Sequence, residues 1–199
     1  MSDKVSDSRT ALLNAAAEEF ARYGPQGARV QAIVKRAGVN ERMIYHHFGS
    51  KNGLYAAVLD AELFRLAELW FPVLDEAAKM DPYEGMHWSL SGFFNTLMDR
   101  PLLTALWLHE ALGGWRTLPL PTAEMLPPQL RELYERGQAQ GVFTSRCPFE
   151  TAYSIAIGAL VALPIVAPRF AEVLKSGPDA DAAQLRDQVV GLLLNGMTG

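Results

Sequence analysis

Residues 29–51 carry a set of side chains that could bind a nucleic acid. Several are hydrogen-bond donors at helical spacing, and a guanidinium, a phenol hydroxyl and an imidazole can all reach phosphate oxygens or base edges. A cation at position 51 would lie beside the outward N–H groups of a helix start, which favours one phosphate. The candidate nucleic-acid contacts are Arg29, Gln31, Asn40, Arg42, Met43, Tyr45, His46 and Lys51.

The helices expected around these residues would hold them on one surface. A helix over residues 30–37 presents an apolar face, Gly38 breaks it, and a second short helix runs over 41–47 with Asn40 as its N-cap. Two short helices joined by a glycine-containing turn form a helix-turn-helix, whose second helix enters the DNA major groove. On that helix Ile44 faces inward and His47 is expected to pack near it, whereas Met43 faces outward, where it could lie against a thymine methyl group.

Other chemistries find little support in the sequence. We see no nucleophile-and-base spacing, no Gly-rich phosphate loop and no metal-ligand cluster, so we expect neither an enzyme nor a bound cofactor or metal. His46 and His47 are adjacent on a helix, about 100° apart, and cannot easily share one ion. The single cysteine, Cys147, is better explained as an inert or helix-capping thiol than as a redox sensor.

Charge and hydrophobicity agree with a cytoplasmic protein that meets a polyanion. Residues 1–60 hold eight Lys/Arg and six Asp/Glu, a net charge of +2, whereas the other 139 residues carry −6. The N-terminus shows no apolar signal segment. The uncharged stretch 152–167 contains Pro164 and is shorter than the roughly 20 residues of a membrane span, so a buried or interface helix is expected.

Helical periodicity extends through the whole chain, and no alternating pattern indicates a strand. We expect about nine helices, and therefore an all-α fold. Gly24-Pro25 should end the first helix, and Pro72 should bend or end the fourth, which begins after Ser50. The expected helices run over 8–23, 30–37, 41–47, 51–70, 82–99, 101–112, 129–140, 148–167 and 179–195.

Residues 8–58 resemble the DNA-binding domain of TetR-type (tetracycline-repressor-like) transcriptional regulators. The resemblance is carried by Leu13, Ala16-Ala17, Phe20, Gly24, Val30, Ile33, Ala37-Gly38-Val39, Ile44-Tyr45-His46-His47-Phe48, Ser50-Lys51 and Leu54. It implies that Tyr45 and Lys51 contact phosphates. It also implies a three-helix head, residues 1–50, followed by a core of about six helices, residues 51–199, that binds an effector and dimerises. The chain departs from the family at Arg29, where Ser or Thr is usual, and at Arg42-Met43, where a small residue followed by Thr is usual.

The resemblance implies an effector pocket, and the aromatic residues of the chain are candidates to line it. All four tryptophans lie beyond residue 50, and large pockets for small molecules are typically lined by such side chains with a few polar groups. An ordinary core remains the alternative for each of them. The candidate effector residues are Trp70, Trp88, Phe94, Met98, Trp107 and Glu110.

The last two expected helices offer apolar faces and small residues that permit close packing. Paired with its copy, this hairpin would form a four-helix interface with twofold symmetry, which would suit a palindromic operator. The candidate interface residues are Tyr153, Ile157, Leu160, Val161, Leu185, Val189 and Leu192.

These observations predict a ligand-responsive DNA-binding regulator, a homodimeric repressor that a small, largely apolar or aromatic effector releases from double-stranded operator DNA. The helix 51–70 would transmit the effector's preference to the head, so that DNA and effector oppose each other. Three alternatives stay open: an activator, a regulator controlled by a protein partner, and an all-helical enzyme.

Overall fold

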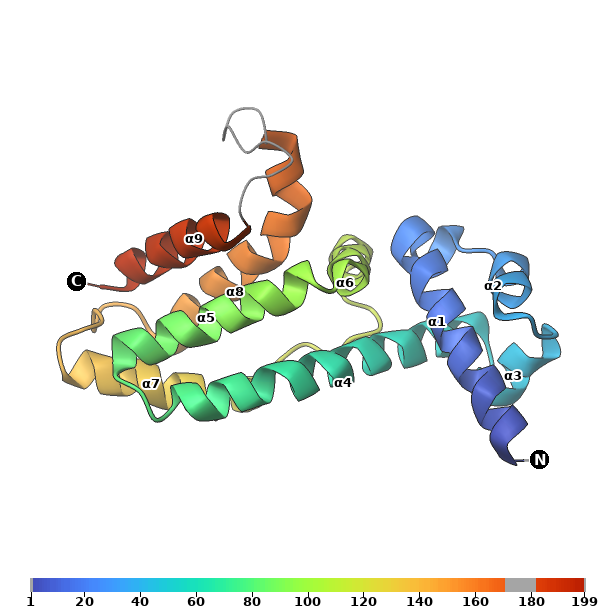
Figure 1. Cartoon of the computed structure of the whole chain (residues 1–199), viewed down its shortest axis with the longest axis horizontal. Helices are drawn as coiled ribbons and strands as arrows, with labels where there is room; N and C mark the ends of the chain where they lie inside the picture. Colours follow the sequence, from blue (N-terminus) through green and yellow to red (C-terminus); the bar gives the residue numbers. More distant parts are fainter. Residues whose placement is uncertain (1, 171–181, 199) are drawn as a thin grey trace. The chain divides into compact units, whose positions relative to one another are not determined.

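The computed structural model describes residues 2–170 and 182–198 (Figure 1). Within these ranges the chain forms nine α-helices, two 3₁₀ turns and no strand, so the all-α prediction is confirmed. The helices are α1 (Ser2–Gly27), α2 (Val30–Ala37), α3 (Arg42–Phe48), α4 (Lys51–Ala77), α5 (Pro82–Met98), α6 (Pro101–Gly113), α7 (Pro128–Ala139), α8 (Phe149–Val166) and α9 (Ala182–Met197).

The chain divides into two compact units, which we call the head and the core. The head comprises residues 1–65 and 102–120, and the core comprises 66–101 and 121–199. The head therefore contains α6 and the first half of α4 in addition to α1, α2 and α3. The domain boundary predicted at residue 50 lies inside this unit.

The head is built on an apolar cluster that draws one face from each of its helices. Each such side chain, once fully buried, contributes about 1.5–3 kcal/mol. The contribution of α6 to this cluster was not apparent from sequence, because it is distant along the chain from the other helices of the head. The fully buried members of the cluster include Leu12, Ala16, Phe20, Ile33, Ile44, Leu54 and Leu106.

Two helices continue past a residue that was expected to end or bend them. Gly24 is non-helical, with φ of 68°, and interrupts α1 as expected, but a further turn carries the helix on to Gly27. Pro72 does not end α4, which continues to Ala77. The reason is packing: Trp70, Leu74 and Ala77 lie on one buried face, and this burial outweighs the hydrogen bond that proline removes.

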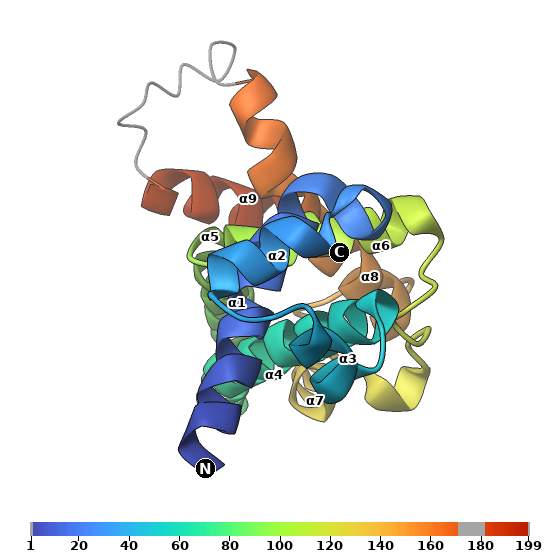
Figure 2. The same ribbon diagram turned by 90° about the vertical axis from the view of Figure 1, so that its right-hand side faces the viewer.

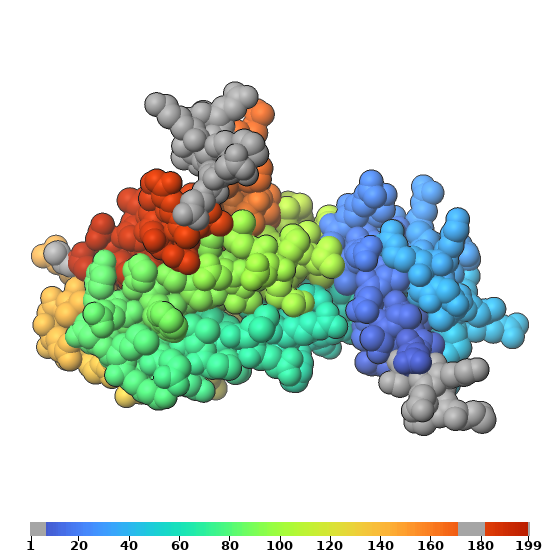
Figure 3. All heavy atoms as spheres, viewed as in Figure 1, coloured from blue at the N-terminus to red at the C-terminus, as the bar shows by residue number. Residues whose placement is uncertain are grey.

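In the core, α5 is the central helix, and α7, α8 and α9 all pack against it. In the space-filling view the side chains of α9 lie directly on those of α5 (Figure 3). The second half of α4 also contacts α5, because the Trp70 ring lies 4.6 Å from the Phe93 ring and its Nε1–H donates to the Ser89 carbonyl, 3.2 Å away.

Candidate nucleic-acid interface

The helix-turn-helix is formed by α2, the turn at Gly38 and α3, seen facing the viewer in Figure 2. Gly38 has a left-handed conformation, φ 67°, that ends α2, and its N–H donates to the Lys35 carbonyl. The N–H of Val39 donates to Val34, and the Val39 side chain packs against the head cluster. The turn is thus fixed from both sides.

Asn40 caps the second helix as predicted. Its Oδ1 accepts from the Arg42 N–H at 2.9 Å, which satisfies one of the free donors at the start of α3. The helix begins one residue later than expected, at Arg42.

The first helix of the motif has no such cap of its own. Arg29 occupies its N-cap position without a capping side-chain bond, and its backbone N–H instead donates to Oε1 of Glu19, 3.1 Å away. Glu19 lies on α1 and is buried. A carboxylate from another helix therefore fixes the backbone at position 29, although it does not accept from the N–H groups of residues 31 and 32 as an N-cap hydroxyl would. Only the fold could show this.

Most of the predicted nucleic-acid contacts lie on the exposed surface of the head. Tyr45 exposes 55% of its surface. Lys51 is partly exposed, and its Nζ uses one of three donors on the Gln26 carbonyl at 3.3 Å. The exposed members are Arg29, Gln31, Asn40, Arg42, Tyr45 and His46.

Met43 corrects a prediction. It was expected to face outward, but it is partly buried and packs against the head cluster. It precedes the fully buried Ile44, and on a helix of seven residues the inward face is wide enough to include part of both side chains. Only the remaining part of Met43 faces solvent.

His47 lies between α3 and the start of α1. Its Nε2 is 2.9 Å from the Ser8 hydroxyl, and its ring lies 5.0 Å from the His46 ring and 5.9 Å from the Phe48 ring. Burial, together with the neighbouring charges of His46 and Arg9, lowers the pKa of His47. This residue packs the recognition helix against α1, whereas the sequence predicted packing near Ile44.

Glu41 is a residue of this surface that sequence reasoning missed. Its Oε2 accepts from Nε2 of Gln31 at 2.6 Å and its Oε1 accepts from the Tyr45 hydroxyl at 3.3 Å. A carboxylate therefore lies between two predicted contact residues. Its spacing of four from Tyr45 was a signal for this arrangement, since residues i and i+4 are neighbours on a helix.

The candidate effector residue Glu110 is buried inside the head, where it bonds backbone N–H groups. Its side chain is 3% exposed, and one oxygen accepts from the N–H groups of Thr117 and Leu118 at 3.0 and 3.1 Å. Burial alone would raise the pKa of Glu110, but these two N–H groups and the Tyr55 hydroxyl lower it. Burial and the nearby carboxylate raise the pKa of Tyr55. Trp107, one turn earlier on α6, is partly buried.

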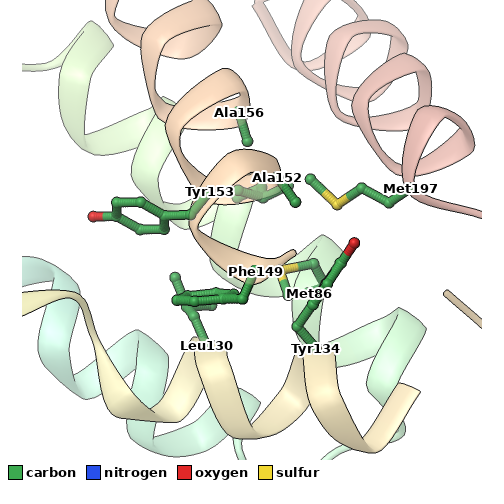
Figure 4. Close-up of a pocket in the computed structure, with 9 residues that line it drawn as sticks. Met86, Leu130, Tyr134, Phe149, Ala152, Tyr153, Ala156 and Met197 are labelled. Atoms are coloured by element: carbon green, nitrogen blue, oxygen red, sulfur yellow. The ribbon is translucent and has the colours of Figure 1, made fainter. Parts of the chain in front are cut away.

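A small cavity lies in the core between α5, α7, α8 and α9 (Figure 4). Its volume is about 10 Å³, close to the space that one water molecule needs. Burial raises the pKa of the Tyr153 phenol in its wall to about 12. The lining residues are Met86, Leu90, Leu130, Tyr134, Phe149, Ala152, Tyr153, Ala156 and Met197.

None of the six candidate effector residues lines this cavity. Trp70 and Phe94 are buried in the core, whereas Trp88 and Met98 are 52% and 42% exposed. Together with Glu110 and Trp107 in the head, they do not converge on one described site.

The outer face of α8 is largely apolar and exposed, and α9 exposes the apolar Leu192 among polar side chains. Only 17% of the most apolar stretch within Phe149–Phe170 is buried in the chain, and this segment has the length and composition of a membrane span. Among the candidate interface residues, Leu192 is 74% exposed and Leu160 is fully buried. Leu160 was expected in the interface, but it packs inside the subunit and does not lie on the outer face. The partly exposed members are Tyr153, Ile157, Val161, Leu185 and Val189.

The described residues contain no group of three or more His, Cys, Asp or Glu side chains that could hold a metal ion. Cys147 is partly exposed, and its thiol lies 3.6 Å from the Pro148 carbonyl oxygen.

Comparison with known proteins relates both units to regulators of transcription. Residues 12–58 match the family model described as bacterial regulatory proteins, tetR family. The chain is 30% identical over 185 residues to the HTH-type transcriptional repressor SCO4008 of Streptomyces coelicolor, covering 89% of this chain and 88% of that protein. It is 31% identical over 153 residues to the HTH-type transcriptional repressor NicS of Pseudomonas putida, covering 73% and 70%.

Among solved structures, a transcriptional regulator of Streptomyces coelicolor, SCO4942, has the same fold. It aligns with a TM-score of 0.71 and 23% identity over 96% of this chain and 98% of its own.

Proposed function

Because this chain belongs to the TetR family of bacterial regulatory proteins, we propose that it represses transcription from a palindromic operator, as a homodimer that a small effector releases. The chain is a ligand-responsive, DNA-binding transcriptional regulator. Its proposed location is the cytoplasm, where the operator DNA lies. The observation that carries the proposal is the head surface itself. A helix-turn-helix with intact turn geometry presents Arg42, Tyr45 and His46 to solvent from one short helix.

Within this surface, Tyr45 and Lys51 are the proposed phosphate anchors. Tyr45 is accessible on α3 and Lys51 at the start of α4, where free N–H groups add to the attraction of Lys51 for an anion. Arg42 and His46 lie on the same exposed helix as Tyr45 and are proposed to reach base edges in the major groove.

The first experiment is a mobility-shift titration with the intergenic DNA upstream of the protein's own gene, at several salt concentrations. Lys51→Ala should weaken binding and reduce the dependence of log affinity on log salt by about 0.9 for each phosphate that is no longer neutralised. Lys79→Ala is the matched control, because Lys79 is an exposed lysine of the core that pairs with Glu76. Unchanged binding by Lys51→Ala would contradict the assignment.

The homodimer is supported by the apolar faces of α8 and α9. Ile155 and Leu192 are large, exposed and apolar, and their helices both pack against α5 on their inner sides. An exposed apolar helix of this kind is typical of a surface that a partner covers. A twofold pair of α8–α9 hairpins is the proposed arrangement, rather than insertion of α8 into a membrane.

The proposed effector site is the cavity between α5, α7, α8 and α9 rather than the aromatic residues first considered. Its wall is apolar, because the Tyr134 and Tyr153 hydroxyls point away from the cavity and that of Tyr134 donates to the Cys147 carbonyl (Figure 4). Met86 and Met197 are flexible side chains that could move to enlarge it. The matching effector is small, uncharged and largely apolar or aromatic.

The small volume of the cavity also favours a second candidate, a regulator controlled by a protein partner. A thermal-shift screen with uncharged aromatic and aliphatic compounds separates the two. An effector should raise the melting temperature and release operator DNA, and Ala156→Val, which adds volume to the wall, should weaken both effects while the variant still binds operator. Absence of any shift with compounds, with operator binding intact, would favour the partner-controlled regulator.

A further inference from the structure

Glu41 is an acidic residue in the middle of a surface proposed to face the polyanion DNA. It lies between Asn40 and Arg42 at the start of α3 and is partly exposed. The hydrogen-bond partners of its side chain are neutral groups, the amide of Gln31 and the hydroxyl of Tyr45. Its negative charge is therefore offset by dipoles rather than by a bonded cation.

The position of the carboxylate determines which parts of DNA it can meet. N-terminal residues of the recognition helix are the ones that contact base edges in a helix-turn-helix, and Glu41 immediately precedes that helix. Its bonds to Gln31 on α2 and Tyr45 on α3 hold the side chain on the exposed side of the motif. A phosphate in this region would be repelled, whereas a base-edge amino group would be attracted.

These two effects act differently on different DNA. Binding to arbitrary sequence depends mostly on phosphate contacts, so an uncompensated carboxylate weakens it. In the major groove the N4 amino group of cytosine is a donor, and carboxylates accept from it. A DNA site that places a cytosine amino group beside the Glu41 carboxylate therefore regains the binding affinity that phosphate repulsion removes at other sites.

We propose that Glu41 determines operator selectivity, by accepting a hydrogen bond from a cytosine amino group in each half-site and repelling phosphates at sites that lack it. This inference rests on the proposed function, because it requires that α3 enters the major groove. It assigns to Glu41 a role distinct from that of Tyr45, which holds a phosphate and carries no sequence information.

The test measures a ratio of affinities. Duplexes selected by the wild-type protein from a random-sequence pool serve as cognate sites, and a scrambled duplex of equal length serves as the non-cognate site, both at one stated salt concentration. For Glu41→Gln we expect non-cognate affinity to rise at least threefold and the cognate-to-non-cognate ratio to fall at least tenfold. Lys51→Ala removes a proposed phosphate anchor that does not bond Glu41, and it should weaken both complexes alike and leave the ratio within twofold.

A base-substitution scan tests the cytosine contact directly. In wild type, one C·G pair per half-site should cost about tenfold in affinity when replaced by T·A, and this cost should fall below twofold in Glu41→Ala. Asp60→Asn is the control for charge, because Asp60 is an exposed carboxylate of the head nine residues beyond Lys51 on α4. It should behave as wild type.

The outcomes are separable. If wild type selects no sequence from the pool, the proposed function fails and this inference fails with it. If wild type selects sites, but Glu41→Gln and Glu41→Ala keep the wild-type ratio and scan while melting normally, Glu41 only holds Gln31 and Tyr45, and the inference alone is overturned.

Discussion

Glu110 shows at the residue scale how a charged group can be buried when backbone donors surround it. Its carboxylate accepts from the N–H groups of Thr117 and Leu118 and lies beside the Tyr55 hydroxyl, all within the head. Such charge-assisted bonds stabilise the ionised form and hold the segment after α6 in place. The same side chain that suggested an effector contact in the sequence thus has a structural role.

We expect Glu110→Ala to lower the free energy of unfolding by about 2 kcal/mol, because the backbone N–H groups of Thr117 and Leu118 would be left without their acceptor. Urea denaturation followed by circular dichroism measures the change. Glu124→Ala is the control, since Glu124 is an exposed carboxylate in the core, and it should alter stability by no more than about 0.5 kcal/mol. Equal stabilities of the two variants would contradict this structural role.

His47 makes the stability of the protein depend on pH. Its pKa in the folded protein is lowered from the ordinary value of 6.5 by burial and by the charges of His46 and Arg9. The unfolded chain therefore binds more protons just below pH 6.5, and folding loses stability as the pH falls through that region.

We expect the melting temperature of wild type to fall between about pH 7.5 and about pH 5, and His47→Gln to reduce this fall. Differential scanning fluorimetry across the pH range measures it. His87→Gln on α5 is the control and should keep the wild-type pH dependence. A His47→Gln profile parallel to wild type would show that other groups cause the effect.

At the scale of elements, the recognition helix depends on its neighbours. Seven residues are too few for a helix to be stable alone. The turn at Gly38, the Asn40 cap and the buried Ile44 together fix α3 against α1 and α2. The left-handed conformation of Gly38 is the most demanding of these, because it requires a positive φ.

We expect Gly38→Ala to destabilise the protein by about 1 kcal/mol, which is the cost of a left-handed conformation in an L-residue. A Cβ at this position would meet no atom within 4 Å, so the cost comes from the backbone alone. Gly196→Ala on α9 also adds a Cβ in open space, but within a helix, and should be neutral or slightly stabilising. Chemical denaturation compares the two. Equal effects would show that the turn tolerates a side chain.

At the scale of the whole molecule, operator binding depends on the proposed dimer interface, which is formed by the exposed faces of α8 and α9. A palindrome presents two half-sites, and a single head reads only one of them. Because each subunit contributes one head, disruption of the dimer should reduce operator affinity even when every DNA-binding residue is intact.

We expect a variant with Ile155→Glu and Leu192→Glu to be monomeric in light scattering and to bind operator at least tenfold more weakly, because two charges would be buried in the interface. Leu112→Glu is the control: Leu112 is 77% exposed on α6, outside the proposed interface, and should leave the dimer unchanged. A dimeric double variant would contradict the proposed interface.

The local features of this protein could be predicted from the sequence because they depend on neighbouring residues. Helical spacing placed Ile44 inward and Tyr45 outward, Gly38 marked the turn, and Asn40 was recognised as a helix cap. Each of these follows from backbone geometry within one or two helical turns.

The tertiary structure decided the features that join distant segments. It brought α6 into the head, bonded the backbone N–H of Arg29 to Glu19, used Glu110 inside the head and buried Leu160 within the subunit. Periodicity shows which face of a helix is apolar but not which element covers it, and several apolar faces can pair in more than one way. Only the packing of the whole chain selects one arrangement, because the free energy of burial is shared among all helices that meet there.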